Sequence, residues 1–189
     1  IERAKALRGP GRVLAGERRC VTPPGFDQGN SPIEARHRRG DELILATSNG
    51  APTIVAATAH APSVLLACLL NLQAVIDALT QEDLLERDLL IVGSGTDGGL
   101  ALEDVYVAGR LSAALSGPRT DAALAAEGVA RAFATPLEAL GASANAAVLR
   151  AAGLTDDIAY CALESELAVV PRVLAVSMGV AVVGRCDHP

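Results

Sequence analysis

Aromatic side chains are scarce in this chain of 189 residues, which has two phenylalanines, two tyrosines and no tryptophan. Methionine occurs once. Half of the residues are hydrophobic, so the core must be built from Ala, Val, Leu and Ile. A chain of this length can bury a substantial single-domain core. Small aliphatic side chains of this kind suit helices packed on a parallel sheet.

Positive charge and long apolar runs are also in short supply. The formal net charge is −6, which argues against a surface for nucleic acid or anionic membranes. The apolar stretch 61–72 is too short to cross a bilayer and contains Asn71. The four cysteines form no CxxC pair and no signal peptide is visible, which indicates reduced thiols. We therefore predict a cytoplasmic protein that binds neither nucleic acid nor membranes.

Hydrophobic periodicity predicts that strands and helices alternate along the chain. Strands are expected at 12–15, 42–46, 63–67, 88–92, 169–176 and 180–183. Helices are expected at 1–7, 32–39, 53–60, 72–79, 101–115, 121–134, 144–152 and 156–163. This order favours one α/β domain over residues 1–189, with helices layered on a largely parallel or mixed central sheet.

The segment 25–32, GFDQGNSP, is the most informative stretch of the sequence. It places the carboxylate of Asp27 and the polar side chains of Asn30 and Ser31 on a turn that leads into a helix. Ser31 is expected to cap that helix, and Glu34 completes a capping box. A helix start attracts phosphate or sulfonate, and Asp27 beside it suits a magnesium ion or an acid–base role. A well-capped turn without chemistry is the alternative.

Three further loops, 48–50, 68–71 and 93–104, lie where a predicted strand is followed by a helix. Ligands of α/β folds gather where strand C-termini meet helix N-termini. Ser48, Asn49 and Gly50 are therefore candidates for holding a phosphate. Each loop taken alone is also explained by an ordinary cap or turn, because glycine and asparagine favour both.

Residues 93–98, GSGTDG, match the GxGxxG pattern of dinucleotide sites. Such a site also needs a second strand that ends in an acid about 20 residues later. Here Gly117 and Pro118 break the following helix, and another helix begins near Asp121. A nucleotide-cofactor enzyme is therefore a disfavoured alternative, which would retain NAD or flavin.

Acidic residues supply the other candidate chemistry. Glu103 and Asp104 open the helix expected at 101–115, and they point about 100° apart, so they cannot form a facing acid pair. One of them can ligate a metal ion while the other compensates the helix dipole, although dipole compensation alone also explains both. Glu17 is either a surface acid or a metal ligand. The histidines lack zinc-ligand spacing, and no GxSxG elbow indicates a covalent hydrolase.

The order of these motifs resembles the 2-phosphosulfolactate phosphatase family, which comprises magnesium-dependent phosphatases associated with coenzyme M biosynthesis. The similarity rests on AGER at 15–18, GFDQGNSP at 25–32, TSNG at 47–50, Asn71, LED at 102–104, Ala108-Gly109, DAA at 121–123, Asp157-Ile158, Cys161 and Val170-Pro171. The family usually begins with a strand that carries an aspartate and an arginine near a Thr-rich helix start. The resemblance therefore implies that residues 1–189 lack this N-terminal strand–helix segment. The family's TTNGT loop appears here with one hydroxyl fewer, as residues 47–51.

The resemblance implies magnesium-dependent hydrolysis of a small anionic phosphomonoester, 2-phosphosulfolactate, to sulfolactate and phosphate. The candidate catalytic residues are Asp27, Glu17 and Glu103, and the candidate Mg²⁺ ligands are Asp27, Glu103 and Asp104. The candidate phosphate-binding residues are Asn30, Ser31, Ser48, Asn49 and Gly50. The alternative is an inactive relative that binds a phosphorylated or sulfonated metabolite, or a structural subunit. Alanine-rich apolar helices are compatible with a homo-oligomer such as a dimer, without fixing its stoichiometry.

Overall fold

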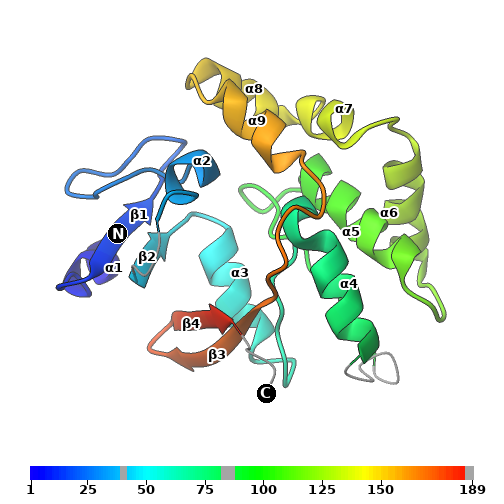
Figure 1. The fold of residues 1–189 in the computed structure, drawn as a ribbon, viewed down its shortest axis with the longest axis horizontal. Helices are drawn as coiled ribbons and strands as arrows, with labels where there is room; N and C mark the ends of the chain where they lie inside the picture. The colour runs from blue at the N-terminus through cyan, green and yellow to red at the C-terminus, as the bar shows by residue number, and fades with distance from the viewer. Residues whose placement is uncertain (39–41, 82–87, 186–189) are drawn as a thin grey trace.

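A computed structural model describes residues 1–38, 42–81 and 88–185 of the chain. Strands β1 (Arg12–Gly16) and β2 (Glu42–Ala46) form a parallel pair in which Leu14 lies opposite Ile44. Helix α1 (Glu2–Ala6) precedes β1, and the short helix α2 (Pro32–Ala35) lies in the crossover between the strands. This group of elements lies at the left of Figure 1.

A helical layer forms the other side of the molecule (Figure 1). Its helices are α4 (Leu72–Gln81), α5 (Leu102–Ala114), α6 (Asp121–Arg131), α7 (Pro136–Gly141), α8 (Ala144–Ala151) and α9 (Thr155–Cys161). Their buried faces share one core of small aliphatic side chains, in which Tyr106 is 2% exposed and meets the edge of Phe133. The scarcity of aromatic residues is therefore matched by an aliphatic core around a single buried tyrosine ring.

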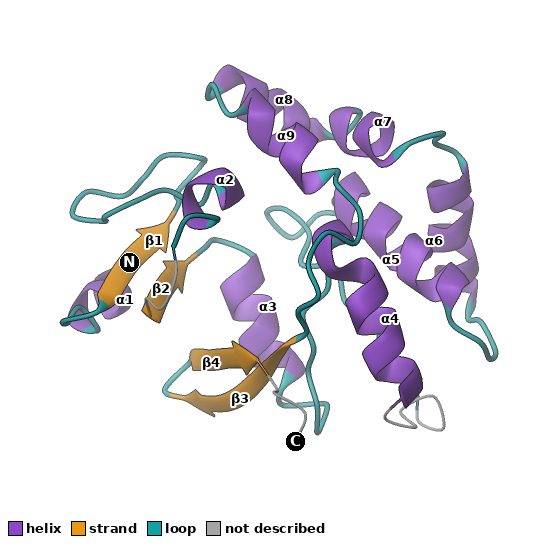
Figure 2. Cartoon of the chain, in the orientation of Figure 1, coloured by secondary structure: helices purple, strands orange, loops and turns teal. Residues whose placement is uncertain are grey.

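Helix α3 (Gly50–Ala57) and a β-hairpin complete the fold, as Figure 2 shows. The hairpin strands, β3 (Pro171–Ser177) and β4 (Val180–Arg185), pair antiparallel, and β4 contacts α3. The 3-10 turn η1 (Leu69–Asn71) leads into α4. The buried Asn71 side chain accepts from the Cys68 N–H and donates to the carbonyls of Leu66 and Val169, so it fixes this loop.

The predicted α/β class is confirmed, because a small parallel sheet is combined with packed helices. The predicted large parallel sheet is only partly found, since β1–β2 is the parallel pair in the described ranges. The expected strand 63–67 contributes one antiparallel bridge, from Leu65 to Arg172. The expected strand 88–92 pairs with no described residue, and its Leu90 is 79% exposed. An apolar run marks a segment suited to a strand, but a strand forms only where a partner supplies hydrogen bonds.

Helix α7 was not predicted, because six residues are too few to show a helical period. Its start is nevertheless capped: the Thr135 hydroxyl accepts from the Glu138 N–H, and the Glu138 carboxylate accepts from the Ala134 N–H. Helix α2 is shorter than the expected helix 32–39, whose last residue lies outside the described residues. Within the described ranges, no helix has both the length and the apolarity needed to cross a membrane.

Candidate active site

Glu17 lies at the carboxyl edge of the parallel pair, directly after β1. One carboxylate oxygen accepts from the Ser48 N–H at 3.2 Å, and the other accepts from the Cys20 N–H at 3.2 Å. A Cβ at the preceding residue, Gly16, would overlap the carbonyl oxygen of Ala46 at the end of β2. The sequence therefore needs glycine at this position, because only then can the two strand ends approach closely enough for Glu17 to bind the loop after β2.

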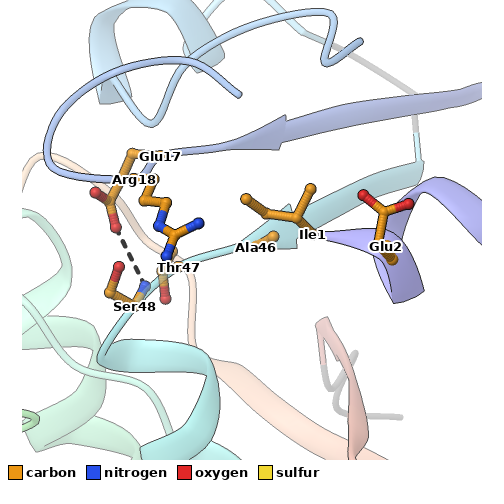
Figure 3. A pocket seen from close by; sticks show the side chains of 7 residues that line it. All are labelled: Ile1, Glu2, Glu17, Arg18, Ala46, Thr47 and Ser48. Atoms are coloured by element: carbon orange, nitrogen blue, oxygen red, sulfur yellow. Dashed lines mark hydrogen bonds between the residues drawn. The ribbon is translucent and has the colours of Figure 1, made fainter. Parts of the chain in front are cut away.

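An open cavity of about 460 Å³ lies beside Glu17. Arg18, Thr47 and Ser48 line it together with Glu17 and the first two residues of the chain, as Figure 3 shows. The cavity is therefore at the edge where two parallel strands end, which is where α/β folds place their ligands.

The start of α3 presents unused hydrogen-bond donors next to this cavity. Asn49 is the N-cap residue, but its side chain does not cap α3; its amide oxygen accepts from the Asp97 N–H at 3.3 Å. Thr47 takes the capping role, because its hydroxyl accepts from the Ala51 N–H at 3.0 Å. The Asn49 amide nitrogen and the Ser48 hydroxyl form no hydrogen bond with any described residue.

The glycine loop 93–99 joins α3 to the helical layer. The Gly95 N–H donates to Asp104 at 2.7 Å, and Thr96 and Gly99 exchange two backbone hydrogen bonds. The Asn145 side-chain amide donates to Glu103 at 2.7 Å and to the Thr96 hydroxyl at 3.2 Å. A polar network thus runs from Asn49 through this loop to both acids at the start of α5.

Asp27 lies apart from that network. One of its carboxylate oxygens accepts from the Leu14 N–H at 2.8 Å, and the other accepts from Arg8 at 3.1 Å. The Leu14 N–H and then the Arg8 guanidinium hold the pKa of Asp27 below its ordinary value. Asp27 therefore fastens the 25–32 turn to β1 as an ionised carboxylate, and its catalytic role stays a prediction.

We expect the Arg8→Met variant to be less stable than the wild type at pH 7. Because the folded-state pKa of Asp27 is lowered, its carboxylate stabilises the fold above the unfolded pKa of about 3.9. That stabilisation is lost as the pH falls through the folded pKa, so the difference between the two proteins shrinks in acid. Urea midpoints measured from pH 7 to pH 3 test this, with Arg19→Met as a control. Equal midpoints for Arg8→Met and the wild type at pH 7 would contradict it.

At the start of α2, the predicted phosphate ligand Ser31 also has a structural role. Ser31 caps α2 as predicted, because its hydroxyl oxygen accepts from the Glu34 N–H at 3.3 Å. Its single proton is donated to the buried Asp157 at 2.7 Å, and so is already engaged. Asn30 is exposed and remains a predicted phosphate ligand. Ser31 and Asp157 thereby link α2 to α9.

Residues 1–175 match the model of a protein family described as 2-phosphosulpholactate phosphatase. The chain belongs to this family. A Thermus thermophilus protein named "Probable 2-phosphosulfolactate phosphatase" is 38% identical over 177 residues, which are 90% of this chain and 74% of the relative. A "2-phosphosulfolactate phosphatase" of Methanothermobacter thermautotrophicus is 34% identical over 171 residues, which are 90% of this chain and 73% of the relative.

The family predicted from the motifs is therefore confirmed, and with it the class of phosphoric monoester hydrolases to which the family's name refers. The motifs of the 2-phosphosulpholactate phosphatase family fall on three places in this structure. The TSNG and LED motifs meet through the glycine loop, and the AGER motif borders the cavity. The GFDQGNSP motif lies along β1 and against α9.

The oxygen donors at the start of α5 fit the chemistry of a magnesium ion. Glu103 and Asp104 each engage one carboxylate oxygen with described residues, which leaves the other oxygen of each for a ligand. Mg²⁺ in phosphate sites usually takes one or two carboxylates together with water and substrate oxygens. Across the described ranges, no three acidic, histidine or cysteine side chains gather as a metal cage, so Asp27 does not join these two acids.

Cys161 does not supply a reactive thiolate. Cys20, Cys68 and Cys161 are free thiols, and Cys186 lies outside the described residues. Burial, together with nearby Asp157 and Cys68, raises the pKa of Cys161 to about 11, so this thiol stays protonated near pH 7.

Sequence reasoning missed two residues of the polar network and its surroundings. Asn145 reaches Glu103 from α8, 42 residues further along the chain, and no local spacing indicates such a contact. Asp157 was noted in a family motif but was assigned no partner, and it is separated from Ser31 by 126 residues. The sequence does hold one signal for Asn145, because it is a polar side chain in the first turn of an alanine-rich helix.

Proposed function

We propose that this chain is a magnesium-dependent phosphatase that hydrolyses 2-phosphosulfolactate to sulfolactate and phosphate, a reaction of the coenzyme M biosynthesis type. Membership of the family and the names of the two relatives support this proposal. One observation on this chain gives the proposal its strongest support. The hydrogen bonds from Asp97 to Asn49 and from Asn145 to Glu103 gather phosphate donors and carboxylates into one network.

The phosphate group binds at the start of α3 in this proposal. Its donors are the Ser48 hydroxyl, the Asn49 side-chain amide and the Gly50 N–H, which lie in consecutive residues. The partial positive charge at a helix start favours an anion there. Because these donors already point at the phosphate, they need not reorient when negative charge builds up on the phosphoryl oxygens. A protein with a net charge of −6 depends on such local dipoles to retain a phosphate.

The two acids at the start of α5 make different contacts with the protein and share one task in the proposed reaction. Asp104 holds the glycine loop through the Gly95 N–H, and Asn145 fixes the direction of the Glu103 carboxylate. Glu103 and Asp104 would hold Mg²⁺ through their remaining oxygens. When bound, that ion neutralises phosphate charge and lowers the pKa of a bound water.

Phosphate release from 2-phosphosulfolactate and from 2-phospholactate, with magnesium and then with EDTA, tests the proposed function. Magnesium-dependent release that favours the sulfonate substrate is the expected result. Equal release from both substrates would contradict the assigned substrate. Binding of 2-phosphosulfolactate without release by folded protein would contradict the phosphatase activity and favour an inactive, metabolite-binding relative.

A further inference from the structure

Arg18 is a cation that faces the cavity and has no acidic partner in the described part of the chain. Its guanidinium forms no ion pair or hydrogen bond with the described residues, whereas Arg8 and Arg12 pair with Asp27 and Glu42. Its side chain lies along the cavity wall beside Thr47 (Figure 3). An exposed and unpaired arginine in a cavity is suited to bind an anionic group, because its fork of N–H donors matches two oxygen atoms.

The backbone holds Arg18 in place through a tight two-residue turn. The N–H of Arg18 donates to the Val21 carbonyl at 2.9 Å, and the N–H of Val21 donates to the Arg18 carbonyl at 3.2 Å. The two residues between them, Arg19 and Cys20, have φ values of 55° and 61°. Residues other than glycine rarely adopt this left-handed conformation, so the turn is under strain. Glu17 stabilises this turn, because its carboxylate accepts a hydrogen bond from the Cys20 N–H.

The acids around the cavity bond to other groups, so the positive charge of Arg18 is available to bind an anion. Both oxygens of Glu17 accept backbone N–H groups, and Glu2 pairs with Lys5 at 3.1 Å. Thr47 adds a hydroxyl whose oxygen accepts the Ala51 N–H, so its proton is free to be donated into the cavity.

The cavity borders the proposed phosphate site. Thr47 and Ser48 line it, and Asn49 and Gly50 follow directly, with consecutive Cα atoms about 3.8 Å apart. A ligand whose phosphate lies at the start of α3 can therefore extend into the cavity that Arg18 lines.

We propose that Arg18, assisted by the Thr47 hydroxyl, binds a second acid group of the substrate, a carboxylate or a sulfonate. The chain thereby selects small phosphomonoesters that carry such a group over those that do not. This inference rests on the proposed function for the position of the phosphate. It assigns substrate selection to a residue that borders the site rather than to the residues that hold the phosphate.

Binding of sulfolactate, which has both acid groups but no phosphate, tests the subsite independently of turnover. Calorimetry should give the same Kd for the wild type and for Arg19→Met, which removes an equal charge from the same turn. Arg18→Met should bind about 10- to 100-fold more weakly, as expected for loss of a charged hydrogen bond. Unchanged binding by Arg18→Met, or no binding of sulfolactate by the wild type, would overturn the proposal.

Turnover of three substrates then identifies the group that Arg18 binds. Arg18→Met should lower kcat/KM about 10- to 100-fold for 2-phosphosulfolactate and leave glycerol 2-phosphate, which has no second acid, within about twofold. An equal loss on 2-phospholactate indicates the carboxylate, and no loss on it indicates the sulfonate. An equal loss on all three substrates would place Arg18 at the phosphate and overturn the proposal. Failure of the wild type to release phosphate from any substrate would refute the proposed function, while the sulfolactate measurement would still decide the subsite.

Discussion

Replacing Glu103 with glutamine is expected to lower kcat/KM for 2-phosphosulfolactate by about 10²- to 10⁴-fold while leaving the fold intact. Glutamine keeps the size of the side chain, and its amide oxygen can still accept the hydrogen bond from Asn145. What it removes is the negative charge at the start of α5. The proposed reaction needs that charge whether Glu103 holds the metal ion or accepts a proton from the attacking water.

Glu138→Gln is the matched control for this prediction, because Glu138 also lies in the first turn of a helix. Its carboxylate accepts the Ala134 N–H and bonds to no described residue of the network, so this variant should retain wild-type turnover. Calorimetric titration with Mg²⁺ separates the two roles of Glu103: weaker binding by Glu103→Gln indicates a metal ligand, and unchanged binding a proton acceptor. Wild-type kcat/KM in Glu103→Gln would remove this residue from the proposed site.

The Gly109→Ala substitution is expected to destabilise the protein by about 1–3 kcal/mol through overpacking. Gly109 is buried where α5 crosses α6, and a Cβ there would overlap the Ala126 carbonyl and lie 2.9 Å from the Ala130 Cβ. Backbone atoms cannot rotate away as a side chain can, so the two helices must separate. The α5–α6 connection resists this movement, because Arg119 bonds to both Glu127 and the Ser112 carbonyl.

Gly128→Ala on α6 is the control, because the same chemical change there meets open space. Alanine is a better helix former than glycine, so this variant should be about 0.5–1 kcal/mol more stable than the wild type. Urea unfolding of the three proteins provides the comparison. A Gly109→Ala protein as stable as the Gly128→Ala protein would show that the helices do not pack as closely as described.

The local features of the fold followed from the sequence, and its long-range pairing did not. Local patterns mark the residues of the strands at 12–15 and 42–46 and the cap at Ser31, and each element lies where its pattern predicts it. The segment 88–92 has equally apolar residues but no strand partner in the described ranges. Pairing depends on residues far along the chain, and periodicity carries no information about them.

The same division holds for the candidate site. Motif spacing singled out Glu17, Asn49 and Glu103 because each follows a strand or opens a helix. It could not show that Asn145 joins Glu103, nor that the Ser31 proton is committed to Asp157. Both contacts form only when helices distant in sequence pack together, which local motif spacing cannot show.

The most direct test of the proposed phosphate position at the start of α3 is a crystal structure of the Glu103→Gln variant with 2-phosphosulfolactate and magnesium. The proposed function predicts the phosphate within hydrogen-bonding distance of Ser48, Asn49 or the Gly50 N–H. A phosphate bound instead beside Asn30 at the start of α2, with nothing at α3, would contradict it.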